Sequence, residues 1–147
     1  MTVPSGNHAR PAVLALGFRP FYLLAALFAI VALPLWMGFY FDTVPAGQYL
    51  VGISWHTHEM LFGFAPAVIA GFLLTAVSNW TRRKTASGWP LAVLALLWLT
   101  GRVLMLTGPA PAAAFIDLLF LPAVAVLTGI PILRSGNYRD QQAEKIW

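Results

Sequence analysis

The residues best suited to chemistry lie in one short block, Trp55–Met60, which reads Trp-His-Thr-His-Glu-Met. His56 and Met60 are four residues apart, so a helix would place both side chains on one face. An imidazole and a thioether together suit copper or haem iron. His56 and Glu59 are three residues apart and could also share a site. The block is therefore a candidate metal or haem site.

His56 and His58 are two residues apart, about 200° around a helix, so they would face opposite ways. One metal ion takes both only if this segment is not helical. In a helix, one histidine could be a ligand while the other bonds a second group, or each could serve a different centre. A simpler interpretation is a solvated His-x-His-Glu at the membrane surface. Four residues remain as candidate metal or haem ligands: His56, His58, Glu59 and Met60.

Arg102 and Asp117 form a second feature, because each lies near the end of an apolar stretch and a short connection joins the two stretches. An ion pair between adjacent antiparallel helices would neutralise both charges at the membrane boundary. Alternatively, Arg102 could hold a propionate or another anion, while Asp117 orients a histidine ligand through its second ring nitrogen. A proton or ion path is a weaker interpretation, because no polar chain continues across the bilayer.

The composition indicates that most of this chain lies in a lipid bilayer. Its 147 residues are 59% hydrophobic and only 10% charged, whereas soluble domains carry about 25% charge. A chain this small could not bury so much apolar surface, which excludes a soluble globular domain and a disordered chain. The chain has no cysteine, which excludes disulfides, thiolate metal sites and cysteine nucleophiles.

Four apolar stretches predict an all-α, polytopic membrane protein. Residues 20–41 and 60–81 carry no charge, and each stretch is long enough as a helix to cross a hydrocarbon core of about 30 Å. Two shorter stretches each hold one charge. We expect a transmembrane domain at 20–134, between a cytoplasmic arm (1–19) and a polar cytoplasmic tail (135–147), with spans at about 20–41, 58–80, 89–106 and 112–133.

Lysine and arginine set the expected orientation. Eight of the nine basic residues fall on one side, which places both termini and the Arg82-Arg83-Lys84 connection in the cytoplasm. The same three residues could attract anionic lipid head groups. Five aromatic residues near span ends suggest an interfacial belt: Tyr40, Tyr49, Trp55, Trp80 and Trp89.

Small residues recur every four positions in the second span, and this spacing lets helix backbones approach closely: Gly63, Ala67, Gly71 and Thr75. The chain has no glycine-rich phosphate loop, no metalloprotease motif and no Ser-His-Asp arrangement. Nothing in these patterns indicates a reaction with turnover, so enzyme status stays open.

Several blocks together resemble the NnrS family, haem- and copper-containing membrane proteins of the bacterial nitric-oxide response: Leu16–Phe21, Trp55–Phe64, Ala67–Val77 and Leu97–Arg102. The resemblance extends over residues 14–139. It implies an inner-membrane protein of denitrification or nitrosative stress, with haem and copper as cofactors and His56 and His58 as the matching candidate ligands.

Members of this family are longer and have more spans, so the resemblance implies that this chain corresponds to the N-terminal third. We expect a truncated or split member, completed by the remaining spans or by a homo-oligomer. The alternative is a non-catalytic four-helix membrane subunit or remnant that packs against a partner protein. No nucleic-acid partner is expected, since the basic residues follow the membrane topology.

Overall fold

A computed structural model describes residues 12–45 and 49–144 of the chain, with side chains up to residue 136. The part of the chain that it describes consists of helices and connections, without a strand. Four helical segments are long and apolar enough to cross a membrane: Phe18–Tyr40, Gly52–Thr81, Trp89–Thr107 and Ala110–Gly136. The prediction of an all-α, polytopic membrane protein with four spans is confirmed.

The first span follows a short 3-10 turn, η1 (Ala12–Leu14), and forms α1 (Phe18–Tyr40). Pro20 lies in the first turn of α1. N–H groups in the first turn have no acceptor within the helix, so the missing N–H of proline costs no hydrogen bond there. The 23 residues of α1 correspond to about 34 Å of helix, which matches the thickness of a bilayer core.

The second span is continuous but consists of three parts. These are α2 (Gly52–His58), the π-helical segment η2 (Glu59–Phe64) and α3 (Ala65–Thr81). The helix thus begins before residue 58, where the sequence places the start of this span. The Trp55–Met60 block lies inside the helix rather than at its entrance.

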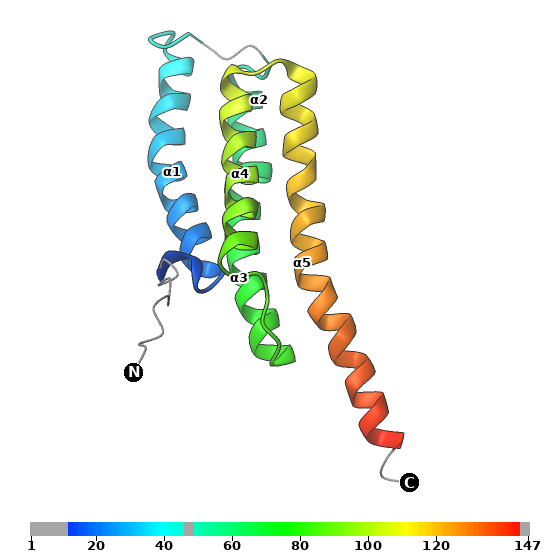
Figure 1. Cartoon of the computed structure of the whole chain (residues 1–147). Coiled ribbons are helices and arrows are strands. Elements are labelled where there is room, and N and C mark those ends of the chain that lie inside the picture. Colours follow the sequence, from blue (N-terminus) through cyan, green and yellow to red (C-terminus); the bar gives the residue numbers. More distant parts are fainter. Residues whose placement is uncertain (1–11, 46–48, 145–147) are drawn as a thin grey trace, which may run out of the picture.

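The last two spans are α4 (Trp89–Thr107) and α5 (Ala110–Glu144). Arg82, at φ 53°, ends α3 in a left-handed conformation, and Gly88, at φ 64°, precedes α4. Helix α5 continues through residues 135–144, part of the expected polar tail. Figure 1 shows its C-terminal end projecting beyond the other helices.

Helix α3 is the most enclosed part of the bundle and packs against both α1 and α5, while α4 packs against α5 (Figure 1). The span that contains α3 is 44% buried, against 22% for the first and last spans. All four spans contribute to the main core, which holds Phe21, Ala25, Ala67, Ala70, Leu74, Leu91, Leu94, Trp98, Phe120 and Val124. A second cluster consists of Ala32, Phe39 and Trp55.

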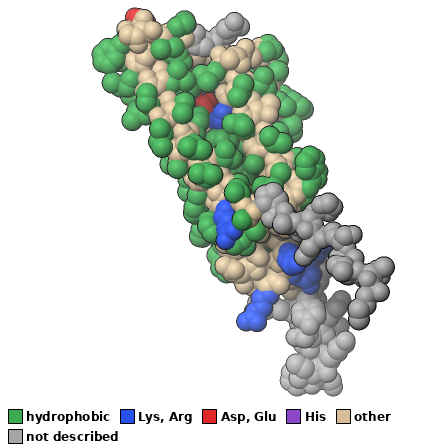
Figure 2. All heavy atoms as spheres, turned by 60° about the vertical axis from the view of Figure 1, so that its left-hand side comes forward, with side chains coloured by type: hydrophobic (Ala, Val, Ile, Leu, Met, Phe, Trp, Pro, Cys, Tyr) green, Lys and Arg blue, Asp and Glu red, His purple; other side chains and the backbone are tan. Residues whose placement is uncertain are grey.

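The two ends of the bundle differ in charge. One end holds the start of α1, the α3–α4 connection and the C-terminal part of α5, and we call it the basic end because it carries Arg19, Arg82, Arg83, Lys84 and Arg134. The opposite end holds the α1–α2 and α4–α5 connections. In Figure 2, basic side chains gather at the lower end of a largely hydrophobic face, and one acidic and one basic side chain lie together higher up.

The aromatic belt needs one correction. Tyr40, Trp80 and Trp89 are strongly exposed near helix ends, as a belt requires, and Tyr49 is partly exposed. Trp55 is only 1% exposed and packs edge-on against Phe39. Its indole belongs to the second core cluster, because α2 turns this face of the span towards α1.

Candidate functional site

A charged cluster lies inside the bundle near the opposite end. It consists of His58, Glu59, Arg102 and Asp117, and we call these four residues the charge cluster. Glu59 lies seven residues into the second span, about 10 Å along the helix. The other members come from α2, α4 and α5. The cluster therefore ties together three of the four spans.

Arg102 lies at the centre of the charge cluster. Its Nη1 donates a hydrogen bond of 2.8 Å to Oε2 of Glu59, and its Nη2 pairs with Oδ1 of Asp117. Glu59 is 1% exposed and Arg102 is 5% exposed. Buried charges are tolerated when they are paired and hydrogen-bonded. One guanidinium thus compensates two carboxylates that belong to different spans.

His58 lies between the same two carboxylates. Its Nδ1 is 3.5 Å from Oε1 of Glu59, and its Nε2 is 3.4 Å from Oδ2 of Asp117. Its ring also stacks on Phe62, with ring centroids 5.1 Å apart. His58 therefore completes a closed ring of four polar side chains.

The local backbone explains how Glu59 reaches this position. In η2 the N–H of Ala65 bonds to the carbonyl of Met60, five residues earlier, which is the π-helical pattern. Pro66 has no N–H, so the carbonyl of Phe62 receives no α-helical bond from it. The wider turn is therefore compatible with this sequence, and such turns are frequent at functional sites.

Gly63 makes room for the guanidinium. A Cβ at this position would lie 2.5 Å from Nη1 of Arg102 and 3.0 Å from Oε2 of Glu59. The Gly63 carbonyl accepts a 2.9 Å hydrogen bond from the indole of Trp98, and the Arg102 guanidinium lies 5.9 Å from that ring. A side chain at residue 63 would displace the charge cluster.

His56 faces a different helix from His58. Its ring stacks on Trp36 of α1, with centroids 4.3 Å apart and planes at 19°. Its Nδ1 is buried and has no hydrogen-bond partner among the described residues. Met60 packs against the second core cluster, which also borders α1. The two histidines therefore serve two separate environments.

These contacts test which residues suit a metal or haem. Within residues 12–45 and 49–136, no three His, Asp or Glu side chains are grouped to hold a metal ion. The charge cluster does not fit one, because a cation beside Glu59 would meet the Arg102 guanidinium. Both His56 and His58 have a buried Nδ1 without a hydrogen-bond partner among the described residues. His56 lies outside the charge cluster and has Met60 on the same side, so it is the histidine that fits the role of a single ligand.

The small residues of the second span lie at helix contacts. A Cβ on Gly71 would lie 3.0 Å from the Tyr22 ring and 3.1 Å from Cβ of Phe21, both in α1. The Thr75 hydroxyl accepts the N–H of Phe18 at 3.2 Å. Ala67 is fully buried in the main core, whereas Gly63 faces the charge cluster as described.

Three aromatic residues around the site were not expected from the sequence: Trp36, Phe62 and Trp98. Phe62 and Trp98 lie four residues after His58 and four before Arg102, so helical spacing could have indicated both. Trp36 lies on another span, and no local pattern connects it with His56.

Comparison with known proteins gives one match. The family model described as NnrS protein matches residues 12–143, slightly beyond the 14–139 range of the resemblance. The match covers most of this chain. No curated protein and no solved structure matches the chain. The chain belongs to the NnrS family.

Proposed function

We propose that this protein is a haem- and copper-associated membrane protein of the response to nitric oxide or nitrosative stress. The observation that carries the proposal is the NnrS family match over residues 12–143, which includes the Trp55–Met60 block. The four apolar spans support a multi-pass membrane protein. Haem and copper come from the family, and His56 offers a suitable donor atom.

In this proposal His56 supplies a ligand nitrogen. Stacking on Trp36 fixes the imidazole plane, and Met60 offers a thioether nearby in the same helix. Haem iron, when bound, supplies a coordination position for a small ligand such as nitric oxide.

The charge cluster has a positioning role in this proposal. Arg102 is engaged by Glu59 and Asp117, which favours the ion-pair interpretation over propionate binding. By joining the second span to α4 and α5, the charge cluster fixes the rotation of α2. It thereby fixes the side on which His56 is presented to α1.

Replacing His56 tests the ligand assignment. The full chain, expressed with haem and copper supply and purified in detergent, should show a haem Soret band and bound copper. The His56→Ala variant should lose at least one of these signals, because the imidazole donor is gone. Absorption spectroscopy and elemental analysis measure the two cofactors.

The matched control is His8→Ala, which removes a histidine from the expected N-terminal arm, outside the described residues. It should retain both signals. Equal cofactor content in the His56→Ala and wild-type proteins would contradict the assignment. A colourless, copper-free wild-type protein would contradict cofactor binding by this chain.

The proposal also includes a location and an orientation. The basic end lies in the cytoplasm of a bacterial inner membrane, following the positive-inside rule. The Trp55–Met60 block then lies towards the outer face, where a small uncharged molecule arrives from outside.

A metal-free subunit is the second candidate. It is favoured by the lack of a three-donor metal group in the described part of the chain. In this case the chain packs against further spans or a second copy of itself. Cofactor-free wild-type protein that still migrates as an oligomer in cross-linking would support this candidate.

A further inference from the structure

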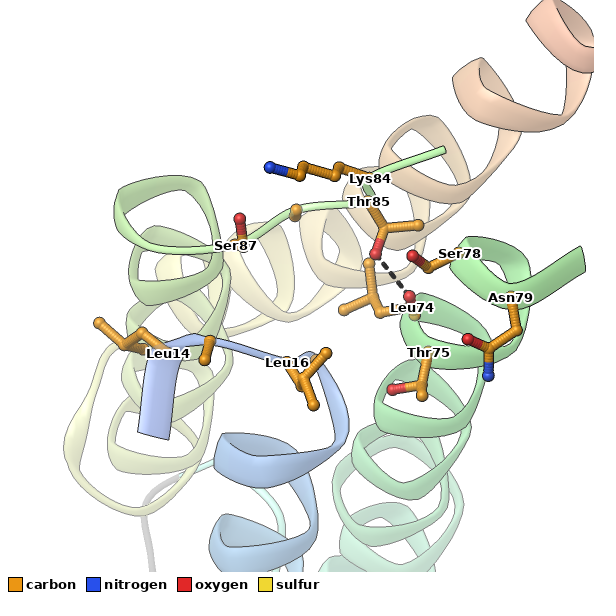
Figure 3. Close-up of a pocket in the computed structure, with 12 residues that line it drawn as sticks. Leu14, Leu16, Leu74, Thr75, Ser78, Asn79, Lys84, Thr85 and Ser87 are labelled. Carbon is orange, nitrogen blue, oxygen red and sulfur yellow. Dashed lines mark hydrogen bonds between the residues drawn. The ribbon is translucent and has the colours of Figure 1, made fainter. Parts of the chain in front are cut away.

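A pocket of about 300 Å³ opens at the basic end, far from the charge cluster (Figure 3). Three segments form its walls: residues 14–17 before α1, residues 74–79 near the end of α3, and residues 84–87 of the α3–α4 connection. Neither the haem proposal nor the core packing uses this space.

Hydrogen bonds hold the three walls together. The Thr85 hydroxyl donates to the Leu74 carbonyl at 2.5 Å, shown as the dashed line in Figure 3. The N–H of Gly88 donates to the carbonyl of Leu14 at 2.8 Å. These bonds fix the three walls relative to one another.

The lining chemistry suits an anion. Hydroxyl and amide groups line the pocket together with one cationic side chain: Ser78, Asn79, Thr85, Ser87 and Lys84. None of the described lining residues is acidic. Arg82 and Arg83 lie immediately beside it in sequence and add positive charge. Phosphate oxygens are suitable acceptors for the Ser78, Ser87, Asn79 and Lys84 side chains, whereas the Thr85 hydroxyl already donates to the Leu74 carbonyl.

A second, apolar hollow continues from the pocket along α3. It is lined by Phe18, Tyr22, Phe72, Ala76 and Trp80, and shares Thr75 and Asn79 with the first pocket. Phe72 is 52% exposed and Trp80 is 68% exposed. The shared residues place a polar pocket directly beside an apolar groove that faces outwards from the spans.

We propose that the two hollows bind one anionic phospholipid, with its phosphate beside Lys84 and an acyl chain along Phe72 and Trp80. The charge of the pocket selects the anionic head group, and the groove selects a lipid over free phosphate. The location fits, because the basic end is where the spans meet the polar region of a bilayer. This site is independent of the haem proposal.

Lipid titration followed by native mass spectrometry of the full chain in detergent tests the proposal. The probes are phosphatidylglycerol, phosphatidylcholine and inorganic phosphate. Wild-type protein should retain one phosphatidylglycerol in preference to the other two. Lys84→Gln should weaken its binding by about fivefold, the effect expected for one cation near an anionic surface.

Arg83→Gln is the matched control, because it removes an exposed charge that does not line the pocket. It should weaken binding less than Lys84→Gln does. Lys84→Arg keeps the charge and should bind nearly as well as wild type. Unchanged helical circular dichroism excludes unfolding as the cause of any loss.

The groove is tested by Phe72→Ala against Ile69→Ala, an exposed residue of α3 outside both hollows. Only Phe72→Ala should weaken phosphatidylglycerol binding. Equal binding of phosphatidylcholine, equal binding of inorganic phosphate, or equal effects of Lys84→Gln and Arg83→Gln would each overturn the proposal.

Discussion

At the scale of single residues, Arg102 neutralises the carboxylates inside this bundle. It faces Glu59 and Asp117 where apolar spans surround it. Charged groups inside membrane segments are costly unless they are paired. Removing the guanidinium would leave two carboxylates facing each other across His58, and their repulsion would add to the lost pairing.

Arg102→Gln is therefore expected to lower the free energy of unfolding by about 3–5 kcal/mol, the usual effect of breaking a buried ion pair from one side. Unfolding in mixed micelles with increasing SDS, followed by circular dichroism, measures the change. The exposed Arg83→Gln should change stability by less than about 0.5 kcal/mol.

Neutralising the carboxylates as well should recover part of this loss. The triple variant with Glu59→Gln, Arg102→Gln and Asp117→Asn leaves no unpaired buried charge, so it should be more stable than Arg102→Gln alone. A triple variant that is less stable than the single variant would show that the charges are not the cause.

At this scale the sequence indicated the right residue types and offered Arg102 and Asp117 as an ion pair, but it did not pair Glu59 with Arg102. Spacing named Glu59 as a candidate metal ligand, whereas its carboxylate lies against Arg102, 43 positions away. Such a contact depends on how far three helices are rotated about their axes. Helical periodicity within one span contains no information about that rotation between spans.

At the scale of elements, the π-helical segment could not be predicted from the sequence. Uncharged runs and prolines locate helices, but a shift from i−4 to i−5 bonding involves small differences between two similar backbone arrangements. Pro66 gave only a partial indication. The helix that contains the second span begins at Gly52, six residues before the expected start of the span at about 58.

The contact between α1 and α3 gives an element-scale prediction. Gly71→Ala should lower the free energy of unfolding by about 1–3 kcal/mol, because the new methyl group must displace the Tyr22 ring and Cβ of Phe21. Thermal unfolding in detergent measures the loss.

Gly129→Ala is the matched control, since a Cβ there meets nothing within 4 Å. It should be neutral or stabilise the protein by up to about 1 kcal/mol, through reduced backbone freedom in the unfolded chain. Equal losses in both variants would show that close helix approach at Gly71 is unimportant.

At the scale of the whole molecule, composition was sufficient for the architecture. The low charge and four apolar stretches predicted four spans, because helices of this length form their backbone hydrogen bonds internally and can therefore cross a lipid bilayer. The sequence could not predict that α5 extends as one helix to Glu144. Polar residues after 134 indicate an exit from the bilayer but do not specify where a helix ends.

The expected orientation can be tested on α5 itself, since the chain has no cysteine. Ala110 and Gly136 are exposed positions towards the opposite and basic ends. In intact spheroplasts a membrane-impermeant maleimide should label Ala110→Cys, whereas Gly136→Cys should react only after the membrane is permeabilised.

The cysteine-free wild-type protein is the blank for this experiment. Labelling of Gly136→Cys alone in intact spheroplasts would show that the protein has the opposite orientation. Labelling of both positions would contradict a single orientation in the membrane.

The charge cluster also has a consequence for biogenesis. Glu59 leaves the ribosome well before Asp117, and at about 5–20 residues per second the interval lasts roughly 3–12 s. During this time the second span holds a carboxylate whose final partners are still unmade. The charge of Glu59 is therefore fully compensated only once α4 and α5 have arrived beside the second span.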